Sequence, residues 1–176
     1  ASLSNMMSSF VLEDLPLTGS MPSSLGLLFT DLAHYFVFED MPYLTGTLPN
    51  ALCSMVKLGR SFRLNKLPLV SGTLPSCLAS ISTLSTNFEV ENLALTGTIP
   101  PSFGSMTSVQ SIFQLAELSL TGTIPPSLCS LSSAEMWGLQ VMPLSGTIPA
   151  CVGSLPNMVG KVPPPFRSSL RGFRCC

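Results

Sequence analysis

Six cysteines and a single histidine are the residues of this chain with the most chemistry to offer. No two cysteines have the C-x-x-C spacing of a zinc site, and His34 is far from all of them along the chain, so we expect no metal site. No serine lies in a G-x-S-x-G turn, and no G-x-x-x-x-G-K phosphate loop occurs. The sequence therefore predicts no enzyme and no cofactor.

Charged side chains form the second group with a recurrent spacing. Seven of the nine acidic residues fall in short windows that repeat along the chain, with two basic residues in one further window. The acids are Glu13, Asp14, Glu39, Asp40, Glu89, Glu91 and Glu117, and the bases are Arg63 and Lys66. An acidic surface with a basic band suits recognition of a mainly basic protein surface. The alternative is that these charges only keep their surface soluble.

A hexapeptide repeat sets the spacing of these windows. LTGSMP, LTGTLP, VSGTLP, LTGTIP, LTGTIP and LSGTIP follow one another at residues 17–22, 44–49, 70–75, 95–100, 120–125 and 144–149. Their glycines are 24 to 27 residues apart. A period in the twenties indicates one short unit stacked on copies of itself, so we expect six coils, numbered here one to six in chain order.

Alignment on the glycines places an aromatic residue in the same column of every coil. The column is Phe10, Phe36, Phe62, Phe88, Phe113 and Trp137, and a second apolar residue follows each two positions later. Alternation with period two predicts strands with one buried face. We expect these near residues 10–15, 36–41, 62–67, 88–93, 113–118 and 137–142, with the charged windows on the other, concave face.

Each coil must then return to start the next strand. Proline follows every glycine by three residues, which removes a ladder donor, and apolar residues recur beyond it, such as Ile99, Phe103 and Met106. These predict an inward-facing 3₁₀ or irregular return segment. The chain up to residue 162 should be a repeat solenoid, and Pro163-Pro164-Pro165 should begin a separate basic tail, 163–176.

The pattern L-x-x-L-x-L-x-x-N-x-L-[ST]-G-x-[IL]-P-x-x-L-x-x-L resembles the plant-type leucine-rich repeat. The resemblance implies an α/β-type right-handed superhelix with short parallel strands on its concave face and 3₁₀ or irregular segments on its convex face. One column departs from the family: Leu15, Met41, Leu67, Leu93, Leu118 and Met142 stand where the family places Asn. The turn amides must then donate to carbonyl groups or water.

Four of the cysteines occupy equivalent positions in neighbouring coils. Cys53 and Cys129 lie seven residues after their glycines, and Cys77 and Cys151 lie five after theirs. This predicts the inter-coil disulfides Cys53–Cys77 and Cys129–Cys151. The alternative is that cysteine is a small apolar filler in the return segment.

Composition limits the partners. Only 10% of the residues are charged, against about 25% in typical soluble domains, which indicates that part of the surface is covered by something else. The alternative is that Ser and Thr supply the polarity of the surface. A pI near 5.7 and an acidic sheet argue against nucleic acid. No apolar run is long enough to cross a bilayer, so contact with a membrane would be through the surface of a membrane complex.

These observations favour a non-catalytic scaffold that binds protein partners, as a subunit or peripheral component of a larger assembly. A secreted or cell-surface recognition module, like the plant receptor ectodomains and inhibitors that share this repeat, is the alternative. A third interpretation is an ice-binding surface, since Thr45 and Thr47, Thr96 and Thr98, and Thr121 and Thr123 flank the glycines in ladders. An extracellular, secretory or organelle-lumenal location is favoured over the cytosol.

Overall fold

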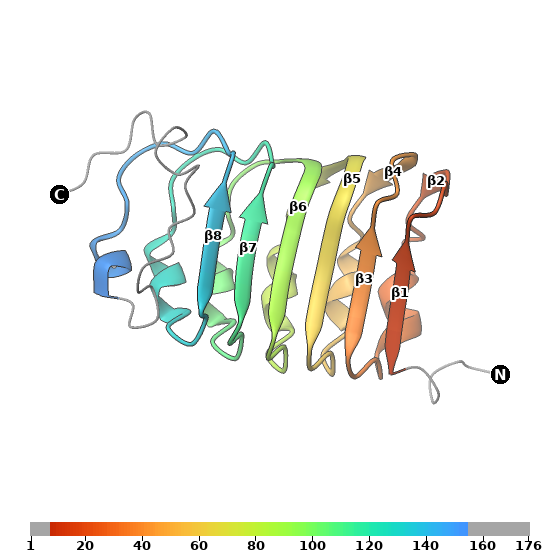
Figure 1. The fold of residues 1–176 in the computed structure, drawn as a ribbon, viewed down its shortest axis with the longest axis horizontal. Coiled ribbons are helices and arrows are strands. Elements are labelled where there is room, and N and C mark those ends of the chain that lie inside the picture. The colour runs from red at the N-terminus through yellow and green to blue at the C-terminus, as the bar shows by residue number, and fades with distance from the viewer. Residues whose placement is uncertain (1–7, 155–176) are drawn as a thin grey trace.

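A computed structural model describes residues 8–154 as a curved stack of six coils (Figure 1). Residues 1–7 and the expected basic tail, 163–176, lie outside the described residues. One parallel strand from each coil builds the main sheet, in the order β1-β3-β5-β6-β7-β8. These strands are β1 (Ser9–Glu13), β3 (Tyr35–Glu39), β5 (Ser61–Thr73), β6 (Asn87–Thr96), β7 (Ile112–Ala116) and β8 (Met136–Gln140). The expected stack of coils, each with one parallel strand, is confirmed.

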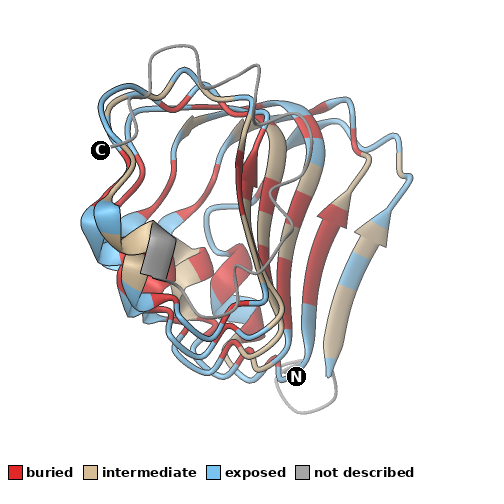
Figure 2. Ribbon diagram, turned by 60° about the vertical axis from the view of Figure 1, so that its left-hand side comes forward, coloured by how far each residue is buried: buried red, intermediate tan, exposed pale blue. Residues whose placement is uncertain are grey.

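The return segments are 3₁₀ helices, and no α-helix occurs in residues 8–154. They are η2 (Leu25–Phe29), η3 (Asn50–Ser54), η4 (Ser76–Ser80), η5 (Pro101–Ser105), η6 (Pro126–Ser130) and η7 (Ala150–Ser154). They line the side opposite the sheet, and the buried residues lie between the two layers (Figure 2). Among the described residues, no helix is long and apolar enough to cross a membrane.

The aromatic column is the centre of this core. Phe36, Phe62, Phe88 and Phe113 pair directly across the sheet and are fully buried. Each ring stacks on the next with a centroid separation of 5.5 Å. Burial of each phenyl group contributes about 1.5–3 kcal/mol, and stacking adds about 0.5–1.5 kcal/mol. The column therefore fixes the register in which all six coils stack.

The strand bounds differ from the expected ones. Every strand begins one residue earlier, and four end two residues earlier, at Glu13, Glu39, Ala116 and Gln140. The residue that follows each of these four has a positive φ, as do Lys66 and Asn92 at the same position of coils three and four. A left-handed residue turns the chain out of the ladder, although β5 and β6 resume pairing beyond it and continue to Thr73 and Thr96.

The chain also pairs at the edge where the repeated hexapeptides lie. The short strand β2 (Gly19–Ser20) pairs with β4 (Leu44–Thr47), which pairs in turn with β5. Between β3 and β4, Met41 occupies the column that is Asn in the family, and it is fully buried. Its amide donates to the carbonyl oxygen of Lys66 at 3.2 Å, so at this turn a backbone carbonyl satisfies the amide, as expected.

Candidate interaction surface on the inner sheet

The solvent-facing side of the main sheet, called here the inner face, carries most of the charges. Glu13, Glu39, Asn65 and Glu91 form one row, because each is the register partner of the next. Arg63 and Glu89 are partners in the neighbouring row. The left-handed column at the ends of the strands adds Asp14, Asp40, Lys66 and Glu117. The structure thus gathers all nine charged residues singled out in the sequence at this face and its upper edge.

Arg63 makes two ion pairs on the inner face. Its Nη2 donates to Glu89 Oε1 at 2.9 Å, and its Nη1 lies 3.7 Å from Glu39 Oε2. Burial disfavours the charge on Arg63, but the hydrogen bond to Glu89 and the charges of Glu89, Glu39 and Glu13 together raise its pKa. Arg63 therefore stays positive and draws the carboxylates of the two neighbouring coils toward coil three.

A second ion pair lies at the exposed end of the strands. Lys66 Nζ donates to Asp40 Oδ2 at 2.9 Å. The hydrogen bond and the charge of Asp40 raise the pKa of Lys66. Because both side chains are largely exposed, this pair stabilises the fold little and mainly neutralises local charge.

Amide side chains donate hydrogen bonds to three carboxylates of the inner face, one of which is the Glu39 carboxylate that also lies near Arg63. Asn65 Nδ2 donates to Glu39 Oε1 at 3.1 Å. Gln114 Nε2 donates to Glu91 Oε2 at 3.1 Å, and Asn92 Nδ2 donates to Glu117 Oε2 at 2.9 Å. These amides occupy the same columns as acids one coil away, but an uncharged side chain adds nothing to the charge pattern that predicted the inner face. They orient the carboxylates without neutralising them.

The inner face therefore keeps an excess of negative charge. Its seven carboxylates and two cations give a net charge of −5. Burial raises the pKa of Glu91, and the charges of Glu117, Glu89 and Glu39 raise it further against the opposing effect of Arg63. A partner cation placed beside Glu91 would relieve this repulsion and favour the ionised form.

The 3₁₀ side of the stack carries two disulfides. The structure joins Cys53 to Cys77, with Cα atoms 5.5 Å apart, and Cys129 to Cys151, with Cα atoms 5.9 Å apart. Each bond ties the 3₁₀ helix of one coil to that of the next, from η3 to η4 and from η6 to η7. The tied pairs of coils are two and three, and five and six.

The remaining reactive residues do not converge. His34 lies against Tyr35, with 6.3 Å between ring centroids, and Asp31 pairs with Lys57 away from the inner face. Within residues 8–154, no three His, Cys, Asp or Glu side chains are grouped to hold a metal ion.

No family model and no curated protein matches the chain. Among solved structures, it is similar to the ectodomain of the Arabidopsis thaliana receptor kinase GASSHO1/SCHENGEN3 in complex with CASPARIAN STRIP INTEGRITY FACTOR 2, with 27% identity, a TM-score of 0.71 and 84% of this chain covered. It is similar to the HAESA ectodomain of Arabidopsis in complex with a peptide hormone, with 26% identity, a TM-score of 0.65 and 83% covered. A plant ice-binding protein matches with 24% identity, a TM-score of 0.69 and 82% covered.

Stacked coils, a parallel sheet and an aromatic core define a solenoid of the leucine-rich repeat class. The likeness to the Arabidopsis ectodomains gives its type: the chain has the plant-type leucine-rich repeat fold. The match spans 17%, 24% and 45% of the GASSHO1/SCHENGEN3, HAESA and ice-binding chains, respectively. The present chain thus spans less than half the length of each of these three chains.

Proposed function

We propose that this chain is a non-catalytic module that binds a protein partner through its inner face. The observation that carries the proposal is the net charge of −5 on a regular sheet on which Glu91 and Glu117 are held by amides rather than by cations. A partner with a basic surface would gain charge complementarity without having to displace existing ion pairs at Glu91 and Glu117. The receptor ectodomains that share the fold were solved with CASPARIAN STRIP INTEGRITY FACTOR 2 and with a peptide hormone, which supports the same class of function.

The disulfides support a location outside the reducing cytosol. Two inter-coil disulfides in one small domain are typical of secreted and cell-surface proteins. We therefore propose a secretory or extracellular module, and a role as one component of a larger assembly in that compartment. The low fraction of charged residues, 10%, supports the presence of further protein-covered surface.

Affinity capture with matched charge variants tests the proposal. The immobilised chain is exposed to a native extract of the source cells, and E91Q/E117Q is compared with D31N/E135Q, which removes as many negative charges away from the inner face. We expect wild type and D31N/E135Q to retain the same basic partner, and E91Q/E117Q to lose about 90% of it, because each exposed charge pair contributes up to about 1 kcal/mol. Equal retention by all three proteins would place the binding surface elsewhere and contradict the proposal.

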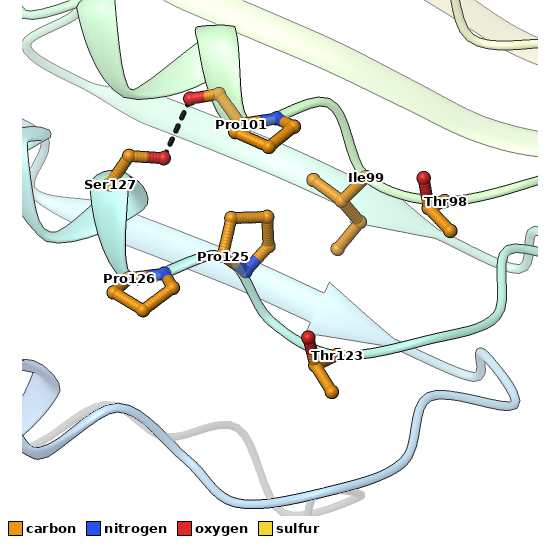
Figure 3. A pocket seen from close by; sticks show the side chains of 7 residues that line it. All are labelled: Thr98, Ile99, Pro101, Thr123, Pro125, Pro126 and Ser127. Atoms are coloured by element: carbon orange, nitrogen blue, oxygen red, sulfur yellow. Dashed lines mark hydrogen bonds between the residues drawn. The ribbon is translucent and has the colours of Figure 1, made fainter.

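A second candidate function, ice binding, is favoured by the hydroxyl rows beside the repeated glycines. Thr45, Thr96 and Thr121 each donate to the carbonyl oxygen of the preceding coil's glycine, at 2.9, 3.2 and 3.2 Å. In the second row, Thr98 and Thr123 are exposed, and Thr98 lies against Gly122 of the next coil. Figure 3 shows these two threonines at equivalent places beside an open hollow. The rows are therefore regular, solvent-facing and fixed in position.

Thermal hysteresis tests this second candidate. If the rows order water, the wild-type chain should lower the freezing point below the melting point, and T98Y/T123Y should abolish the gap because the bulky rings break both regularity and contact. S82Y/S108Y, which changes two exposed serines outside the rows, is the control. The absence of hysteresis in the wild-type protein would exclude ice binding and leave the protein-binding proposal intact.

A further inference from the structure

Large apolar side chains gather at one edge of the first three coils. Leu17, Tyr43 and Leu69 are 41%, 57% and 51% exposed, and all three lie between the left-handed residue of their coil and the repeated glycine. Tyr43 and Leu69 precede their glycines by the same three residues, so they occupy equivalent places in adjacent coils. Coils of a parallel stack are about 4.8 Å apart, which brings the two side chains next to each other.

An extra residue in coils two and three explains the exposure. The glycine follows the aromatic residue by ten positions in these coils, as from Phe36 to Gly46, but by nine in the other four, as from Phe88 to Gly97. The ladder between β5 and β6 also shifts register in this segment, between Leu67 and Ser71. The inserted position thus lies within the segment that contains Tyr43 in coil two and Leu69 in coil three.

The core does not need these two side chains. In coil two, Met41 and Leu44 on either side are buried at 0% and 5% exposure, and in coil three Leu67 and Val70 are fully buried. Coil four fills the same core positions with Leu93 and Leu95 and has only Ala94 between them. The insertion therefore adds an apolar surface without adding to the core, and contiguous apolar surface of this kind marks binding sites.

Uncompensated carboxylates border this apolar surface. Glu13 and Asp14, at the end of β1 in the adjacent coil, are exposed and make no ion pair within residues 8–154. The nearer charges, Asp40 and Lys66, already neutralise each other. Along this edge, a partner would first contact the Glu13 and Asp14 carboxylates, which make no ion pair within residues 8–154. It would then contact the apolar side chains of Tyr43 and Leu69.

We propose that Glu13, Asp14, Tyr43 and Leu69 form a docking site for an extended segment of a protein partner that carries Lys or Arg close to a large apolar side chain. The apolar side chain would cover Tyr43 and Leu69, and the cation would reach the two carboxylates about 5–10 Å away along the stack, a span of two to three extended residues. The inference rests on the proposed protein-binding function and specifies a part of it, since the insertion adds apolar anchoring to charge complementarity.

Selection from a random library of short displayed peptides, followed by affinity measurement with the selected peptide made synthetically, tests the docking site. We expect enrichment of peptides in which Lys or Arg lies within a few residues of Phe, Tyr, Leu or Met. The Y43S/L69S variant should bind the synthetic peptide at least about tenfold more weakly, because it removes both apolar anchors. E13Q/D14N should weaken binding by several-fold at low salt and by less at high salt.

The control is L27S/V56S, which removes two equally exposed apolar side chains from the 3₁₀ side, 59% and 48% exposed, and should bind like wild type. Selected peptides that lack basic residues, or that bind Y43S/L69S as well as wild type, would overturn the proposal. A wild-type dimer that Y43S/L69S dissociates in sedimentation analysis would also overturn it, since a second copy would then be the occupant. Because the capture experiment changes only Glu91 and Glu117 on the inner face, failure of the docking-site proposal would leave the outcome of that experiment, and the proposed function, unaffected.

Discussion

Replacement of all four disulfide-bonded cysteines by serine is expected to lower the free energy of unfolding by about 6 kcal/mol. Each disulfide closes a loop of one coil, with sequence separations of 24 and 22 residues, and loops of this size restrict the unfolded chain by about 3 kcal/mol. The two bonds share no coil, so their contributions should add. Since typical domains are stable by 5–15 kcal/mol, the quadruple variant should be largely unfolded near 37 °C.

Thermal unfolding of the wild type and of the separate pairs C53S/C77S and C129S/C151S measures this loss. In a stack where each coil contacts only its neighbours, each pair should act locally, so amide hydrogen exchange should accelerate first in coils two and three or in coils five and six. S76A/S130A, in the same 3₁₀ helices, is the control and should unfold like wild type. An unfolding curve that excess reductant does not shift would contradict the predicted role of the disulfides and weaken the proposed secretory location.

The coil architecture was predictable because one pattern repeats in every copy. Phe36, Phe62, Phe88 and Phe113 recur nine or ten residues before the glycine of their coil, and an aromatic residue retained in every coil reports a shared environment. The position of Glu39 and Glu91 on one face followed from the same register, since side chains in a strand alternate with period two. The period alone therefore predicted the fold class and the gathering of charge.

Other features of the structure leave no such pattern. The residue with a positive φ at this turn is Asp, Asp, Lys, Asn, Glu and Val in coils one to six, so its residue type does not predict its backbone conformation. Only Asp and Asn among these favour that conformation, and the stacking of the coils imposes it on Val141. The predicted strands were consequently too long at four of their ends.

The hydrogen bonds of the inner face could not be predicted from the sequence either. Asn65, Asn92 and Gln114 are uncharged, so the charge pattern did not predict them. Each lies one coil away from the carboxylate to which it donates a hydrogen bond. Arg63 lies closer to Glu89 than to Glu39. Glu89 is its direct register partner and Glu39 lies on a diagonal, and side-chain distances differ between these two arrangements. A sequence pattern gives the row but not the pairing within it.

Equivalent positions in the 3₁₀ helices join the coils in two different ways. Cys53 contacts Cys77 and Cys129 contacts Cys151 through disulfides, whereas the same column has Gly104 against Ser127 of the next coil. A Cβ built on Gly104 would lie 2.2 Å from the carbonyl oxygen and 2.6 Å from the carbonyl carbon of Ser127. The backbones of coils four and five therefore approach one another more closely than any side chain allows.

Gly104→Ala is accordingly expected to lower the free energy of unfolding by about 2–3 kcal/mol, since coils four and five must move apart to admit one methyl group. The collision is with backbone atoms, so G104A/S127G should be no more stable than G104A alone. S108A, at an exposed site just after the same 3₁₀ helix, is the control and should change stability by less than about 0.5 kcal/mol. Denaturant unfolding measures all three variants. A wild-type midpoint for G104A would mean that the two 3₁₀ helices lie farther apart than the structure places them, and that close backbone packing does not replace the missing disulfide between these coils.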